Sequence, residues 1–122
     1  MQRAPTTGDY LLKLERDMVG GFLHLLILQH LARHQVLHGY GLIKAMEEGT
    51  GGRGLWKEGT IYPLLAAMEA EGLVRSRWGV GEEGPRRKYY ELTGAGRQVL
   101  RLAKAQWADL RAMLDALLEG TA

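Results

Sequence analysis

The sequence predicts a mainly α-helical fold with a small β-hairpin (α+β) and a long C-terminal helix. Three stretches with helical spacing come first, between residues 9 and 72. Two short alternating stretches, 73–78 and 86–92, flank a turn rich in glycine, and a heptad stripe then runs from residue 100 to residue 117. The order helix, helix, helix and hairpin is that of a winged helix-turn-helix, so we expect that fold followed by a dimerisation helix.

The first helix is predicted over residues 9–33, with Thr7 or Asp9 as its N-terminal cap. Its second half, residues 22–32, is apolar nearly all round, which indicates burial on several sides. We therefore expect this half to be the central helix of the domain. The pair Gly20-Gly21 is expected to kink or split the helix.

The second helix is predicted over residues 40–48, with Leu42, Ile43 and Met46 facing inward. The segment that follows, 49–54, matches the dinucleotide-binding pattern G-x-G-x-x-G. That pattern requires a strand before it, whereas here a helix precedes it, so we interpret it as a plain connection. Leu55 and Trp56 are expected to form a very short strand.

The third helix is predicted from Gly59 to Gly72, where a left-handed glycine would end it. Pro63 is expected near its start, where a missing N–H costs little. Four apolar side chains form a stripe toward the core, namely Ile61, Leu64, Leu65 and Met68. Small residues occupy the opposite face, namely Gly59, Thr60, Pro63, Ala66, Ala67 and Ala70. Small side chains let a large partner approach closely, and a DNA groove is one candidate.

The predicted hairpin is basic. The segment from Leu73 to Leu92 contains five cationic residues (Arg75, Arg77, Arg86, Arg87, Lys88) and three acidic residues (Glu82, Glu83, Glu91). Its net charge of +2 equals the formal charge of the whole chain. Such local basicity suits contact with phosphates. Because strand residues alternate, Arg86 and Lys88 should point one way and Arg87 the other, beside Glu69 or another acid. One of Tyr89 and Tyr90 should face the core for the same reason.

The last helix is predicted from its cap at Thr93 to about Glu119. Its apolar stripe follows heptad a and d spacing and consists of Leu100, Ala103, Trp107, Leu110, Leu114 and Leu117. So long a helix has little of its own domain to pack against, so a homodimer is expected. Trp107 has two interpretations, which remain open: it fills the dimer seam, or it lines a pocket for a small planar aromatic effector.

Several motifs together carry a family resemblance. They are Gly21-Phe22-Leu23 with residues 25–28, His38-Gly39-Tyr40, residues 59–65 (Gly-Thr-Ile-Tyr-Pro-Leu-Leu) with Glu69 and Gly72-Leu73, and residues 85–93 (Pro-Arg-Arg-Lys-Tyr-Tyr-Glu-Leu-Thr) with Gly96. In this order and spacing the sequence resembles the PadR family of bacterial transcriptional regulators, in its compact subfamily. The resemblance implies an N-terminal helical arm (1–20), a winged helix-turn-helix DNA-binding domain (21–92) and a C-terminal dimerisation helix (93–122).

The resemblance further implies a repressor whose third helix enters the major groove of double-stranded DNA. The expected DNA contacts are Lys57, Thr60, Tyr62, Pro63, Ala66, Arg75, Arg77, Arg86, Arg87 and Lys88. Family members often place a basic residue on this helix where the chain has Ala66 and Ala67, so Lys57, Thr60 and Tyr62 should contribute more. We expect a homodimer on a pseudo-palindromic operator, released by a small aromatic or hydrophobic effector. The alternative is a winged-helix module that binds a protein without operator binding.

Other functions are disfavoured by the composition. The chain has no Cys, which suits a reducing cytoplasm, and its most apolar run, residues 19–28, is too short to span a bilayer. His30, His34 and His38 are four residues apart, but no carboxylate or Cys lies beside them, so no metal and no cofactor is expected. No nucleophile-base pair or phosphate cradle is evident, so an enzyme is not expected.

Overall fold

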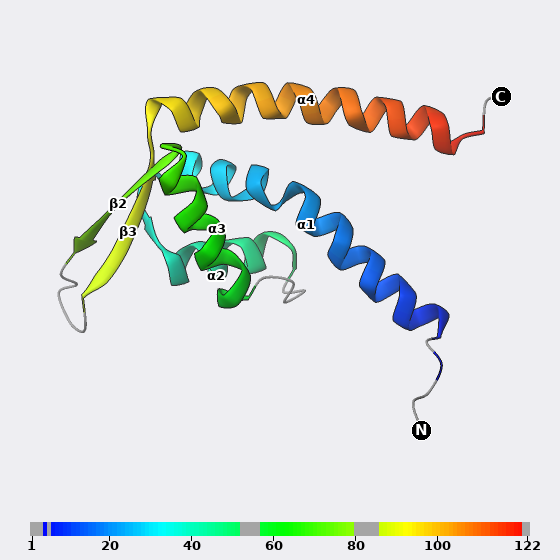
Figure 1. Ribbon diagram of the computed structural model, residues 1–122, viewed down its shortest axis with the longest axis horizontal. Helices are drawn as coiled ribbons and strands as arrows, with labels where there is room; N and C mark the ends of the chain where they lie inside the picture. The colour runs from blue at the N-terminus through cyan, green and yellow to red at the C-terminus, as the bar shows by residue number, and fades with distance from the viewer. Residues whose placement is uncertain (1–3, 5, 52–56, 80–85, 121–122) are drawn as a thin grey trace.

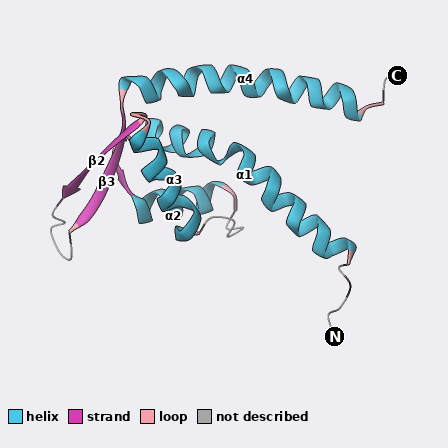
Figure 2. Cartoon of the chain, viewed as in Figure 1, coloured by secondary structure: helices cyan, strands magenta, loops and turns pink. Residues whose placement is uncertain are grey.

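The structure, a computed structural model, describes residues 4, 6–51, 57–79 and 86–120. In chain order its elements are α1 (Thr7–His34), β1 (Leu37–His38), α2 (Gly39–Gly49), α3 (Glu58–Ala70), β2 (Val74–Gly79), β3 (Arg87–Leu92) and α4 (Gly94–Leu118). The hairpin of β2 and β3 projects from one end, whereas α1 and α4 extend toward the other (Figures 1 and 2). The predicted class, mainly helical with a small β element, is confirmed.

The C-terminal half of α1 forms the centre of the core. Four of its side chains are buried, as predicted from the apolar residues on nearly all sides of residues 22–32, namely Leu23, Ile27, Leu28 and Leu31. Side chains of α2 and α3 pack around them, namely Leu42, Ile43, Met46, Ile61, Leu65 and Met68. Each fully buried aliphatic side chain contributes about 1.5–3 kcal/mol to stability, so this cluster holds the first three helices together. Within the described residues no helix is long and apolar enough to cross a membrane.

Helix α1 is continuous from Thr7 to His34, so Gly20-Gly21 does not split it, although the ribbon bends along its length (Figure 1). The predicted caps, Thr7 and Asp9, were wrong. Thr6 is the N-cap: its hydroxyl oxygen accepts from the Asp9 N–H at 3.0 Å, and the Asp9 carboxylate accepts from the Thr6 N–H at 3.0 Å. This reciprocal capping box needs a threonine and an acid three residues apart, which Thr6 and Asp9 supply.

The sheet has three antiparallel strands in the order β1-β3-β2, of which β2 and β3 form the predicted hairpin. The unpredicted strand β1 pairs Leu37 with Tyr90 and His38 with Tyr89. A strand of two residues has no alternation to detect, which is why sequence reasoning missed it. The strand expected at Leu55 and Trp56, and residues 52–54 of the G-x-G-x-x-G match, lie outside the described residues.

Helix α3 buries its predicted stripe, with Leu64 half-buried and the other three side chains buried. The expected place of Pro63 was wrong: it is the sixth helical residue, so it removes the N–H that would bond to the Gly59 carbonyl. Both residues lie on the exposed face, where water can satisfy that carbonyl. The predicted end is confirmed, because Gly72 has φ 77° and Leu73 N–H donates to the Met68 carbonyl at 2.9 Å.

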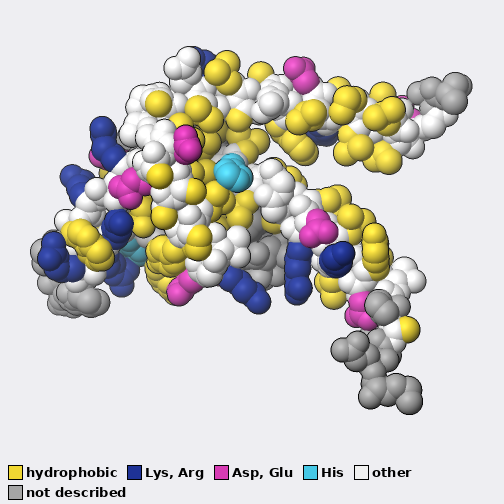
Figure 3. Space-filling view, viewed as in Figure 1, with side chains coloured by type: hydrophobic (Ala, Val, Ile, Leu, Met, Phe, Trp, Pro, Cys, Tyr) yellow, Lys and Arg dark blue, Asp and Glu magenta, His cyan; other side chains and the backbone are white. Residues whose placement is uncertain are grey.

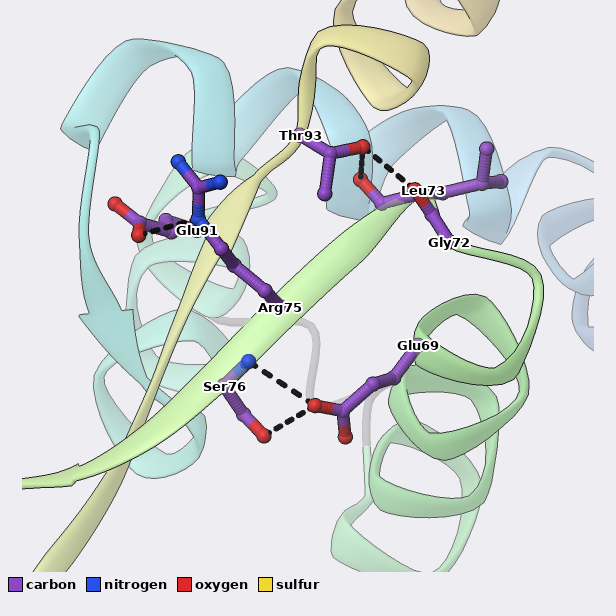
Figure 4. A network of polar contacts seen from close by, with 7 residues as sticks. All are labelled: Glu69, Gly72, Leu73, Arg75, Ser76, Glu91 and Thr93. Carbon is purple, nitrogen blue, oxygen red and sulfur yellow. Dashed lines mark hydrogen bonds and ion pairs between the residues drawn. The ribbon is translucent and has the colours of Figure 1, made fainter.

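The end of α3 is joined directly to the start of α4 (Figure 4). Thr93, the predicted N-cap, accepts from the Gly96 N–H at 3.0 Å, and its hydroxyl donates to the Gly72 carbonyl at 2.6 Å. Thr93 N–H also donates to the Leu73 carbonyl at 3.1 Å. A Cβ at Gly96 would lie 2.0 Å from the Leu73 carbonyl oxygen, so only glycine fits there. We call these contacts of Gly72, Leu73, Thr93 and Gly96 the α3–α4 junction.

Replacing Gly96 with alanine should destabilise the fold by about 1–3 kcal/mol, since the backbone of Leu73 must move to admit a methyl group. Urea unfolding followed by circular dichroism measures this loss. Gly94→Ala is the matched control, because a Cβ at Gly94 meets nothing within 4 Å. Equal stability of the two variants would contradict this account of the junction.

Candidate nucleic-acid interface

The outward face of α3 is exposed and consists mostly of small side chains. Thr60, Pro63 and Ala66 are exposed there, together with Gly59, Ala67 and Ala70, as expected from the sequence. Lys57 lies at the N-cap of α3 and is exposed, so a cation stands at the start of this face. Backbone and small side chains can therefore approach a partner surface closely along the helix.

Tyr62 connects this face to the start of α2. Its side chain is 38% exposed, and its ring lies against Gly39, where a Cβ would come within 2.3 Å of a ring carbon and 2.6 Å of the hydroxyl oxygen. Burial and the neighbouring Glu58 carboxylate raise the pKa of the Tyr62 hydroxyl, so it remains a proton donor. Gly39 is thus the residue that leaves room for the ring of Tyr62.

The face of the hairpin that looks toward α3 carries Trp78, Arg86 and Lys88. Trp78 is 59% exposed and pairs with Lys88 in the strand register. The Arg86 guanidinium lies 5.8 Å and the Lys88 ammonium 6.0 Å from the centre of the Trp78 ring. Cations held on an aromatic face remain available to phosphates. Sequence reasoning did not select Trp78, although the strand period places it beside Lys88.

Arg87 is exposed at the start of β3, and its predicted partner was wrong. Its Nη1 lies 3.0 Å from Nε2 of His38, at the start of α2. Glu69 instead pairs with Lys88, whose Nζ lies 3.9 Å from Oε1 of Glu69. Glu69 extends from α3 toward the inner face of the hairpin, where Lys88 and not Arg87 is found.

Glu69 fixes the hairpin to α3. Its carboxylate accepts hydrogen bonds from the Ser76 N–H at 3.0 Å and from the Ser76 hydroxyl (Figure 4). Tyr90, which opposes Ser76 in the register, is buried, and burial together with Glu69 raises the pKa of its hydroxyl. The core-facing residue of the Tyr89-Tyr90 pair is therefore Tyr90. These contacts set the position of the hairpin cations relative to α3.

The two cations on β2 differ in their surroundings. Arg75 donates from Nε to the Glu91 carboxylate at 2.7 Å across the strands, and this bond holds the pKa of Glu91 below its usual value (Figure 4). Arg77 is exposed and opposes Tyr89. Arg75 thus already has an acidic partner, which leaves Arg77 as the more available of the two predicted contacts.

A cavity of about 380 Å³ lies between the start of α2, α3 and the hairpin. It is lined by His38, Gly39, Tyr40, Tyr62, Trp78, Arg86, Arg87, Lys88 and Tyr90. The structure thus brings together Tyr62, Arg86, Arg87 and Lys88 from the predicted set, whereas Arg75 and Arg77 do not line this space. Aromatic walls with three cations suit an anionic ligand that has an apolar part.

A second cavity, of about 220 Å³, lies between α1 and α4. Phe22 and Trp107 meet there with ring centres 5.8 Å apart, and His24 and Gln106 supply polar groups. Of the predicted stripe, Leu100 is buried and Ala103 half-buried, whereas Trp107, Leu110, Leu114 and Leu117 are exposed. Figure 3 shows hydrophobic side chains gathered along the edge of α4 that faces α1.

The three histidines considered for metal binding have other contacts. His30 bonds through Nδ1 to the Leu26 carbonyl at 2.8 Å, and its ring stacks on that of His34. His38 caps α2, since its Nδ1 accepts from the Gly41 N–H at 2.9 Å. Among the described residues, no three potential metal ligands are grouped.

Comparison with known proteins agrees with this architecture. The family model described as the transcriptional regulator PadR-like family matches residues 27–102. The chain is 35% identical to the transcriptional regulator YqjI of Escherichia coli over 102 residues, covering 84% of this chain but only 47% of that protein. This chain therefore spans about half the length of YqjI.

Solved structures are also similar. A PadR family transcriptional regulator from Eggerthella lenta has a TM-score of 0.83 and 32% identity, with 93% of this chain and 96% of that one covered. A PadR-like regulator from Bacillus cereus has a TM-score of 0.71 and 32% identity, with 85% and 98% covered. With its winged helix, basic hairpin and matching family model, the chain belongs to the PadR-like family of transcriptional regulators, which are DNA-binding regulators and not enzymes.

Proposed function

We propose that this chain is a homodimeric repressor that binds a pseudo-palindromic operator and is released by a small planar aromatic ligand. The observation that carries the proposal is the pairing of two surfaces: the small-residue face of α3 and the cations of the hairpin beside it. A smooth helix face fits the major groove, and cations beside it fit the phosphates.

In this proposal α3 inserts with its exposed face toward the bases. Lys57, Thr60 and Tyr62 provide the polar contacts, while Pro63 and Ala66 allow close approach. Arg86, Arg87 and Lys88 neutralise phosphates, together with Arg77, which lies nearer the base of the hairpin, opposite Tyr89. Because α3 carries few polar groups, the hairpin provides most of the affinity and α3 most of the fit to the groove.

The exposed stripe of α4 supports a homodimer. Leu110, Leu114 and Leu117 are 48%, 50% and 70% exposed in the single chain, so a second copy of α4 would remove a long apolar strip from water. The N-terminal half of α1 also exposes large apolar side chains, including Tyr10, Leu11 and Met18, which could extend the same contact. A two-fold dimer would place its two α3 helices in successive major grooves, about 34 Å apart.

The cavity between α1 and α4 supports an effector site. Phe22 and Trp107 offer rings for stacking, and His24 and Gln106 offer hydrogen bonds to a polar substituent. Because the cavity adjoins the dimer stripe, a ligand there would change how the two subunits pack. Release of DNA requires that the ligand bind the DNA-competent and incompetent dimers unequally.

Removing the inner hairpin cations should weaken DNA binding. With DNA from upstream of its own gene, Arg86→Ala with Lys88→Ala should lower affinity and reduce the slope of log affinity against log salt by about 0.9 for each phosphate that is no longer neutralised. A gel shift at several salt concentrations measures both, with Arg101→Ala on α4 as control. If the unaltered chain does not bind this DNA, or binds it with an affinity that does not depend on salt, the protein-interaction alternative is favoured. The nearly uncharged face of α3 is the observation that supports that alternative.

A charge in the α4 stripe should separate the subunits. Leu114→Glu should weaken the dimer by at least about 2 kcal/mol, because a buried carboxylate lacks a partner there. Sedimentation equilibrium should then show the monomer mass at concentrations where the unaltered chain is dimeric. Lys104→Glu, on the same helix outside the stripe, is the control; equal effects of both variants would exclude α4 as the seam.

Trp107 should report and support ligand binding. In a variant whose only tryptophan is Trp107, planar aromatic compounds, from phenolic acids to three-ring dyes, should quench its fluorescence. Trp107→Ala should lower their affinity about tenfold, measured by calorimetry, because a stacking surface is removed. Trp107→Phe should retain most of it. Unchanged affinity in Trp107→Ala would mean that this cavity is not the ligand site.

A further inference from the structure

His38 makes two contacts that cannot both be hydrogen bonds. Its Nδ1 lies 2.9 Å from the Gly41 nitrogen and its Nε2 lies 3.0 Å from Nη1 of Arg87. A backbone N–H and a guanidinium are both donors, so each contact needs an acceptor nitrogen. A neutral imidazole has only one, since its other nitrogen carries a proton.

The cap decides which nitrogen accepts. The Gly41 N–H is fixed by the first turn of α2, whereas Arg87 is a long exposed side chain that can rotate. Nδ1 therefore accepts from Gly41, and the proton of the ring lies on Nε2. Partial burial and the charge of Arg87 lower the pKa of His38, which keeps the ring neutral. Nε2–H and the guanidinium of Arg87 then face each other as two donors without an acceptor between them.

The surroundings of these two donors suit an anion. The Tyr62 hydroxyl lies beside Gly39, the residue after His38, and remains protonated. The cavity of about 380 Å³ is lined by all four of these residues, His38, Gly39, Tyr62 and Arg87. Arg86 and Lys88 add two further cations to its lining. None of the described residues that line it is acidic, although Glu69 lies 3.9 Å from the Lys88 ammonium behind it.

We infer that His38, Arg87 and Tyr62 form a clamp for one phosphate of the DNA backbone in each half-site. The inference rests on the proposed operator binding and adds His38 as a contact. The phosphate oxygens accept from Nε2–H of His38, from the Arg87 guanidinium and from the Tyr62 hydroxyl, which relieves the donor–donor approach. Because these groups come from the start of α2, from α3 and from β3, one phosphate would fix the insertion depth of α3 relative to the hairpin.

The substitution His38→Asn separates the two roles of the histidine. An asparagine oxygen can accept from the Gly41 N–H and keep α2 capped, but no group replaces Nε2–H. Arg87→Gln removes the charge, and the double variant tests whether the two side chains share a ligand. His34→Asn and Lys104→Gln are the matched controls. Thermal unfolding checks that each variant is folded as the unaltered chain is.

The DNA is the shortest duplex that a footprint upstream of the gene shows to be protected. A series of these duplexes carries one neutral methylphosphonate each, at every backbone position in turn, and the affinity for each duplex is measured. Each single variant should bind about tenfold more weakly, and the double variant should lose less than the product of the two losses. One methylphosphonate per half-site should weaken the unaltered chain but have little further effect on His38→Asn.

Additive losses, or equal sensitivity of His38→Asn to every methylphosphonate, would overturn the clamp while leaving operator binding intact. Normal affinity of His38→Asn would do the same. If the unaltered chain fails to bind the duplex at all, operator binding itself is wrong and the clamp falls with it.

Discussion

The hydroxyl of Thr93 holds the start of α4 on the turn that ends α3, and the rest of the molecule depends on this contact. It donates to the Gly72 carbonyl while accepting from the Gly96 N–H, and Gly96 lets the two backbones touch. The hairpin intervenes in sequence, yet the junction brings its two ends together. As a result the turn that ends α3 is hydrogen-bonded to the first turn of α4, so a displacement of α4 against a partner would act directly on the end of α3.

Several polar residues near α3 position the hairpin relative to the helix and are not themselves available to contact a ligand. Glu69 binds Ser76 and so sets the hairpin against the helix, while Arg75 and Glu91 tie the two strands to each other. Exposed ion pairs of this kind add little to stability, so their main effect is to restrict where the hairpin can lie. The cations left for a ligand are then Arg77, Arg86, Arg87 and, in part, Lys88, all presented by a framework that is already ordered.

The periodic spacing of apolar residues predicted most of the fold, because burying one face of a helix or strand imposes that spacing on the sequence. The stripe of α3, the caps at Thr93 and Gly72 and the central half of α1 all follow from spacing and local backbone chemistry. The failures concern what spacing does not encode. Alternation separated Arg87 from Arg86 and Lys88 but could not name His38 as its neighbour, because that neighbour belongs to a two-residue strand 49 positions away. Trp78 was missed because its contacts arise only when β2 and β3 pair.

The contact between Gly39 and Tyr62 links two distant positions of the chain. A side chain at the first position would occupy the space of the ring at the second. Substitutions during evolution should therefore be correlated: a relative that acquires a larger residue in place of Gly39 must lose the aromatic ring in place of Tyr62, turn that ring away, or shift α2 away from α3. The pair is thus a marker of how closely these two helices approach, and it can be read from sequence alone in any protein with this fold.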